Sequence, residues 1–141
     1  MAENTELTTT TNPTDAPVSI LGGVWSSIHA ETREQMLDLY DAVSDSESLE
    51  DMVNQTISVQ DVILQPVEMT DERTGEVQRR NRIVLVTPDG KAYGCVSSGI
   101  ETSMRNLFAI VGMPPWTPAI DFTVVKKTGR NGYKFMSLKR A

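Results

Sequence analysis

The sequence predicts a mainly β protein with accessory helices, in which the elements follow the order β-β-β-α-β-β of a five-stranded OB-type barrel. The hydrophobic period changes near Ile57 from a helical to a strand-like one, and runs rich in Val and Ile then recur between turn signals. One helical stripe interrupts these runs after the third strand. We divide the chain into a disordered tail (residues 1–17), an acidic helical segment (18–54) and an OB-like domain (55–141).

The part of the chain before the predicted strands is polar at its start and helical in its middle. Residues 1–17 are Thr-rich and hold little that a fold could bury, and such segments stay disordered. An apolar stripe at spacing i, i+3, i+4 and i+7 then indicates a helix with Thr32 as its N-cap. The stripe consists of Met36, Leu39, Tyr40 and Val43. A second short helix is predicted near Ser48.

The strands are predicted from β-branched, partly alternating runs bounded by turns. Their ranges are 57–69, 77–87, 91–97, 120–127 and 133–139. The first turn ends in Gly75, which can take a positive φ, and Pro88-Asp89-Gly90 is a strong signal for a tight turn. A further turn is predicted at 128–132.

An amphipathic helix separates the third strand from the fourth. Its apolar face is formed by Ile100, Met104, Leu107, Phe108 and Val111. Ser98 and Glu101 have the spacing of a capping box at its start. Gly112, followed by two prolines, ends it.

Charges are distributed very unevenly along the chain, whose formal net charge is −6. Residues 1–70 contain 13 acidic residues and one basic residue, whereas residues 71–141 contain 12 basic and 6 acidic residues. Only the second part can attract a polyanion such as nucleic acid.

Several classes of function lack the residues that they need. His29 is the only histidine and Cys95 the only cysteine, so no Cys/His zinc set can form. His29 lies toward the N-terminal end, and the basic half of the chain has no histidine for a Ser-His-Asp triad. The sequence has no phosphate-binding Gly-Lys-Ser/Thr loop and no apolar run of the roughly 18 residues that span a membrane. We expect no enzymatic activity, no cofactor and no metal. The single cysteine fits a cytoplasmic protein, and Cys95 is expected to be a buried small hydrophobe.

Positive side chains gather at two places that are distant in sequence. One group, Arg79 to Arg82, lies beside the predicted loop between the first and second strands. The other, Lys126 to Lys134, flanks the loop between the fourth and fifth strands. In an OB barrel these two loops and the face of strands two and three bind oligonucleotides. We therefore expect the two groups to converge on one face.

Alternation along the strands predicts which side chains reach that face. In the second strand Ile83 and Leu85 share one side and Arg80 and Arg82 share the other. If the apolar pair fills the barrel, the two arginines point outward. Tyr93 on the third strand would then lie beside them if it also points outward.

The candidate binding residues fall into two chemical groups, since single strands are held by cations along the phosphates and by rings on which bases stack. The phosphate-binding candidates are Arg79, Arg80, Arg82, Lys91, Lys126, Lys127, Arg130 and Lys134. The stacking candidates are Tyr93, Trp116 and Tyr133. Two alternatives stay open: each ring could belong to the core, with Trp116 capping the barrel end, and the cations could form an ordinary solvated surface.

The stretch from Ile57 to Leu138 resembles the single-stranded DNA-binding proteins encoded by some bacteriophages and mobile elements. The segments that carry the likeness are Ile57 to Ile63, Thr74 to Glu76, Arg82 to Val86, Asp89 to Tyr93, Val96 to Ile100 and Gly112 to Trp116. The resemblance covers a little over half of the chain. It implies an OB-type core, coating of single strands during replication, and no catalysis.

Together these observations predict a protein that coats and protects single-stranded DNA during phage-type replication or recombination, without sequence specificity, in the host bacterial cytoplasm. RNA is a second candidate ligand. Self-association through the apolar stripe and contacts of the acidic segment with replication proteins are further expectations, and no membrane partner is expected. The alternative is a protein-interaction or virion-structural module in which the acidic helix and the basic barrel pair between subunits.

Overall fold

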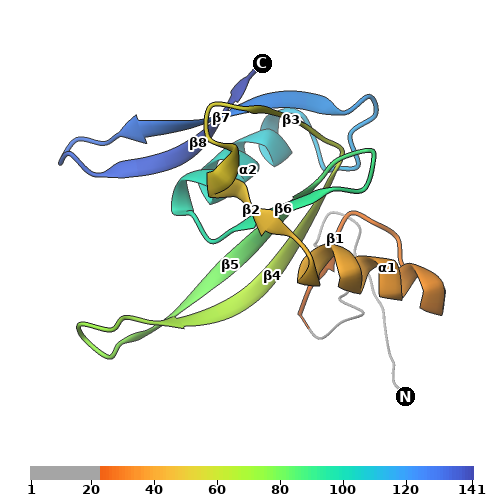
Figure 1. The fold of residues 1–141 in the computed structure, drawn as a ribbon, viewed down its shortest axis with the longest axis horizontal. Helices are drawn as coiled ribbons and strands as arrows, with labels where there is room; N and C mark the ends of the chain where they lie inside the picture. The colour runs from red at the N-terminus through yellow and green to blue at the C-terminus, as the bar shows by residue number, and fades with distance from the viewer. Residues whose placement is uncertain (1–22) are drawn as a thin grey trace.

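The computed structural model describes residues 23–141 (Figure 1). The expected disordered tail, residues 1–17, lies outside the described residues, as do residues 18–22 of the expected helical segment. In chain order the elements are β1 (Trp25–Ser26), α1 (Arg33–Ser44), β2 (Glu47–Ser48), the 3-10 helix η1 (Leu49–Met52), β3 (Thr56–Val59), β4 (Asp61–Thr70), β5 (Val77–Val86), β6 (Ala92–Cys95), α2 (Ser98–Ile110), β7 (Ile120–Thr128) and β8 (Lys134–Arg140).

The strands form two sheets that share one long stretch of chain. The first sheet has the order β1-β4-β5-β6-β2 and the second the order β3-β7-β8. Only Gln60 separates β3 from β4, so the first predicted strand passes from one sheet into the other. The predicted order of three strands, one helix and two strands is confirmed.

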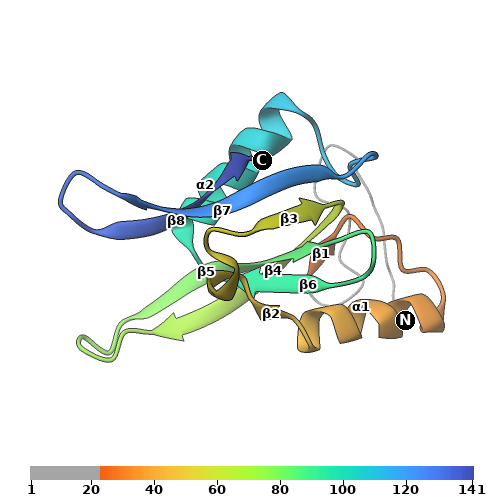
Figure 2. The same ribbon diagram turned by 45° about the horizontal axis from the view of Figure 1, so that its top comes forward.

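The sheets do not close into the five-stranded barrel that the sequence predicts. Closure would pair β6 with β8, but β2 takes the edge of β6, running parallel to it with Glu47 opposite Tyr93. Helix α2 instead packs along β8, where a Cβ at Gly99 would lie 2.0 Å from the carbonyl oxygen of Met136. Only glycine allows so close an approach, and two open sheets with α2 beside the second are the result (Figure 2).

The main hydrophobic core lies between the two sheets and α2. Ile83 and Leu85 of β5 and Ile100 of α2 are fully buried in it. Val84, which alternates with the first two, belongs to a second buried cluster on the opposite face of the sheet, under α1. The apolar run of β5 is thus buried on both faces, as is typical of a strand covered from both sides.

Helix α1 covers the outer face of the first sheet. It begins after Thr32, which forms the predicted N-cap in a capping box with Gln35. Leu39 is buried beneath it, whereas Tyr40, expected in the same stripe, is 62% exposed. Ala42 packs against the second cluster in its place. Because the rest of the stripe faces the sheet, the expectation that it is free for self-association is wrong.

The start of α2 differs from the prediction by one residue. Its N-cap is Ser97, whose Oγ accepts a hydrogen bond from the backbone N–H of Ile100. Glu101 therefore does not complete a capping box with Ser98 and pairs with Arg105 one turn later, at 2.9 Å. Gly112, with φ at 110°, follows the C-cap as predicted.

Candidate nucleic-acid interface

Two β-hairpins extend from the body of the molecule as arms. The first arm is the outer part of the β4–β5 hairpin (residues 65–82), and the second arm is the outer part of the β7–β8 hairpin (residues 125–135). Their tips project to the same side in Figure 1 and in Figure 2. Gly75 at φ 74° and Gly132 at φ 79° allow the two turns. The turns of the two hairpins therefore lie on one side of the molecule.

The face of strands two and three, which OB barrels use for oligonucleotides, is covered in this protein. These strands are β5 and β6, and α1 packs over their outer side, burying Val84, Val86 and Ala92. A polyanion could reach this face only by displacing a helix whose own surface is acidic. The arms, which extend past α1, are the basic elements that remain accessible.

Two of the rings expected to stack on bases are part of the core. Tyr93 is 7% exposed and packs into the main cluster, so the expectation that it points outward is wrong. Trp116 is 6% exposed, packs against Phe108 with centroids 6.2 Å apart, and donates from Nε1 to the carbonyl of Gly112 at 3.0 Å. Apolar burial thus holds both rings away from solvent, and Trp116 caps the core as the alternative interpretation had it.

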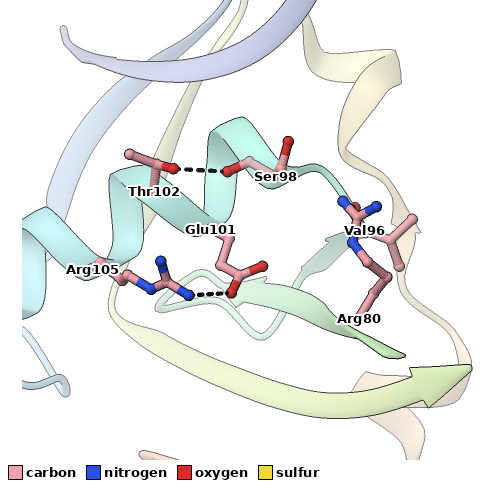
Figure 3. A network of polar contacts seen from close by, with 6 residues as sticks. All are labelled: Arg80, Val96, Ser98, Glu101, Thr102 and Arg105. Atoms are coloured by element: carbon pink, nitrogen blue, oxygen red, sulfur yellow. Dashed lines mark hydrogen bonds and ion pairs between the residues drawn. The ribbon is translucent and has the colours of Figure 1, made fainter. Parts of the chain in front are cut away.

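Arg80 lies on the outward face of β5, as predicted, because Ile83 and Leu85 on the other face fill the main core. Arg80 is half-buried, and its Nη2 donates to the carbonyl of Val96 at 3.0 Å (Figure 3). This bond ties β5 to the segment that leads into α2. Arg80 therefore braces the base of the first arm and keeps only part of its donor set for a ligand.

Arg82 is also outward but is held by α1. It donates to the carbonyl of Val43 at 3.3 Å and to Oγ of Ser46. A cation at the C-terminal end of a helix satisfies unpaired carbonyls and opposes the negative end of the helix dipole. Gly94 leaves room for this contact, since a Cβ there would lie 2.7 Å from the guanidinium. Arg82 is thus engaged in fixing α1.

Lys91 is not brought together with the other candidate cations. It lies in the turn between β5 and β6, at the opposite end of β5 from the first arm. There it lines a hollow of about 570 Å³ together with Asp38 and Asp41 of α1 and Asp45, the C-cap of that helix. Glu47 also lines the hollow, which brings the number of carboxylates around it to four. Lys91 therefore lies in an acidic environment.

The second arm carries most of the accessible positive charge. Residues 120–140 contain six basic residues and one acidic residue, Asp121. Cross-strand pairing places Lys127 opposite Phe135 on one face of the ribbon, and Lys126 opposite Met136 on the other. Lys134 and Arg130 are exposed near the tip. The ribbon therefore presents cations on both of its faces.

The positive charges of Lys126 and Arg79 are partly neutralised by nearby carboxylates. Lys126 pairs with Glu50 of η1 at 3.0 Å, with 41% and 62% of the two side chains exposed. Exposed pairs of this kind contribute little to stability and can exchange for another anion. Arg79 of the first arm is exposed and lies directly across from Glu68 in the ribbon.

One ring remains available beside these cations. Tyr133, at the end of the second arm, is 60% exposed. The only other tyrosine with comparable exposure is Tyr40, which stands among the carboxylates of α1. Tyr133 is therefore the ring that can stack on a base of a bound polyanion.

The match of the chain to a protein family covers nearly its whole length. Residues 19–140 match a family model described as phage single-stranded DNA-binding protein. The chain belongs to this family. No curated protein and no solved structure matches the chain.

A phage single-stranded DNA-binding protein needs groups that bind rather than groups that react. Cys95 packs against the main core, and burial raises the pKa of its thiol, which keeps it protonated and unreactive near neutral pH. Within residues 23–141, no three His, Cys, Asp or Glu side chains converge as ligands for a metal ion. No described helix is long and apolar enough to cross a membrane.

The sequence reasoning missed a groove between α2 and β8, which we call the α2–β8 groove. It has a volume of about 270 Å³ and is lined mainly by Ser98, Thr102, Ser103, Asn106, Tyr133 and Phe135. A signal for it exists in the sequence, because positions 102, 103 and 106 form a polar stripe beside the apolar face of the helix. Its connection to the last strand depends on tertiary packing and cannot be deduced from that stripe.

Proposed function

We propose that this phage single-stranded DNA-binding protein coats and protects single strands during replication or recombination by holding them along its two arms. The observation that carries the proposal is the second arm, where the exposed cations Lys127, Arg130 and Lys134 share one hairpin with an exposed ring, Tyr133. Cations that follow the phosphates and a ring that accepts a base are the two components of single-strand binding. Neither component depends on base identity, which fits coating of any sequence.

The first arm contributes a second row of contacts. Arg79 is exposed on it, and Arg80 keeps donors free beyond its bond to Val96, because a guanidinium has five N–H groups. Lys126 joins the interface by exchanging Glu50 for a phosphate. The negative residues of the first arm, of which Glu68 lies opposite Arg79, make this arm the weaker partner.

Helix α1 acts in this proposal as a fixed cover over the outer face of the first sheet. Its apolar side is buried on the first sheet, and Arg82 holds its C-terminal end. Its carboxylates repel DNA from the outer face of β5 and β6. The same acidic surface is accessible to basic regions of replication proteins, which are the partners that we propose for it.

Titration of labelled oligo-dT with the full-length chain tests the proposal. We expect saturable binding whose log affinity falls linearly with log salt, and protection of long single strands from nuclease. Duplex DNA and RNA of the same length serve as comparisons for ligand preference. A module that only pairs its acidic helix with the basic arms of another subunit would bind no oligo-dT at low salt, and that result would refute the proposal.

A further inference from the structure

The α2–β8 groove has the chemistry of a site for a planar polar ligand. Phe135 is half-buried in its wall and Tyr133 stands at its edge. The opposite wall presents hydroxyl groups and the amide of Asn106, which makes no hydrogen bond to any side chain or backbone group of residues 23–141. Drug-sized ligands occupy about 300–1,000 Å³, so a groove of about 270 Å³ suits one small ring system.

Two of the hydroxyl groups in the wall are oriented by the helix itself. Thr102 Oγ1 donates to the carbonyl of Ser98 at 3.0 Å (Figure 3), and Ser103 Oγ donates to the carbonyl of Gly99 at 3.2 Å. Thr102 Oγ1 thereby keeps its lone pairs for an external donor, whereas Ser103 Oγ also accepts from the backbone N–H of Leu138 at 3.4 Å. The amide of Asn106 adds both a donor and an acceptor. The edge of a nucleobase carries the same mixture of groups.

The α2–β8 groove differs in the charge of its lining from the hollow under α1. The hollow is roughly twice as large, but four carboxylates line it. The α2–β8 groove has no acidic residue in its lining. Lys127 lies directly opposite Phe135 on the same face of the second arm. A nucleotide in the groove would therefore have a cation close to its phosphate.

We propose that the α2–β8 groove takes one unpaired nucleobase of the bound strand and reads its edge through Asn106. The inference rests on the proposed function and adds to it a preference for certain bases at one position. Tyr133 and Phe135 hold the ring by stacking, which is tolerant of sequence. The amide of Asn106 can complete its hydrogen bonds only with some base edges, and an unmatched edge leaves polar groups unpaired.

Binding of the full-length chain to dT, dC and dA oligonucleotides of equal length, at one salt concentration, tests this inference. We expect the tightest and weakest of the three to differ at least about 5-fold in wild type. The variant Asn106→Ala should bring them to within about 2-fold of one another. The side chains of Asn106 and Tyr133 are both exposed. Replacing either of them by alanine therefore removes no buried contact of the fold.

The variant Tyr133→Ala should weaken binding to all three oligonucleotides by about 5-fold or more, the smaller end of what one stacked base contributes. Tyr40→Ala is the matched control, since Tyr40 is 62% exposed and Tyr133 60%. It should change affinity by less than about 2-fold.

Persistence of the wild-type differences in Asn106→Ala would overturn the inference, because they would then arise from stacking within the DNA. Absence of any binding by wild type would instead refute the proposed function itself.

Discussion

Replacing Lys127 and Arg130 together by glutamine should halve the salt dependence of DNA binding. Four of the candidate phosphate-binding cations have no hydrogen bond or ion pair from their side chains to residues 23–141 and lie in the arms, namely Arg79, Lys127, Arg130 and Lys134. With about 0.7 counterions released per phosphate contact on a single strand, four contacts give a log–log slope of about −2.8 and two give about −1.4. Raising salt from about 50 to 200 mM should then weaken wild type about 50-fold and the variant about 7-fold.

Fluorescence anisotropy of labelled oligo-dT at a series of salt concentrations measures these slopes. The matched control replaces Arg33 and Lys91, which are exposed cations on α1 and in the β5–β6 turn, away from the arms. The control should keep the wild-type slope while losing the same two charges. If the Lys127 and Arg130 variant keeps the wild-type slope, or if the control lowers the slope equally, the assignment of the phosphate contacts is wrong.

Three further predictions concern stability and reactivity. Leu39→Ala should lower the free energy of unfolding by about 2–5 kcal/mol in urea titration, because this buried side chain anchors α1, with little change in oligo-dT affinity. Gly99→Ala should cost about 1–3 kcal/mol in the same assay, because its Cβ would meet the carbonyl of Met136; stability equal to wild type would contradict the α2–β8 packing. Because burial raises the pKa of the Cys95 thiol, alkylation at pH 8 should be slower in the folded than in the urea-unfolded protein. The stability linked to this proton is present below pH 9.0 and is lost as the pH rises toward the raised pKa, and Cys95→Ala should lack that loss.

The order of elements could be predicted because local patterns determine it. Turn residues such as Gly75 and Gly90 adopt the positive φ that their turns require, and Thr32 caps α1 as its spacing indicates. These features depend on residues that are close in sequence.

Burial of individual rings could not be predicted in the same way. The alternation of Tyr93 with its neighbours allows either face, and only the packing of both sheets selects the inside for it. Alternation predicts an interior filled by Ile83 and Leu85, whereas α1 creates a second buried cluster on the outer face of the same strand. The pairing of β2 with β6, which prevents closure, joins Glu47 to Tyr93 across 46 positions of the chain and has no local signal.

The hydrogen bonds of Arg82 show why the accessible cations of the site could not be predicted from the sequence either. Its charge and its place on β5 predict a phosphate contact, but the C-terminal carbonyl of α1 lies within hydrogen-bond distance and takes its donors. Lys91 likewise has the expected charge but lies at the far end of β5. Charge and alternation identified the arms, and tertiary contacts decided which cations stay accessible there.

Photo-crosslinking of the full-length chain to oligo-dT containing 5-iodouracil, followed by mass spectrometry of the peptides, locates the path of the strand most directly. Crosslinks should concentrate in residues 125–135 of the second arm and 98–106 of α2, with Tyr133 prominent among them. Crosslinks concentrated in residues 33–44 of α1 or 87–91 of the β5–β6 turn would contradict binding along the arms.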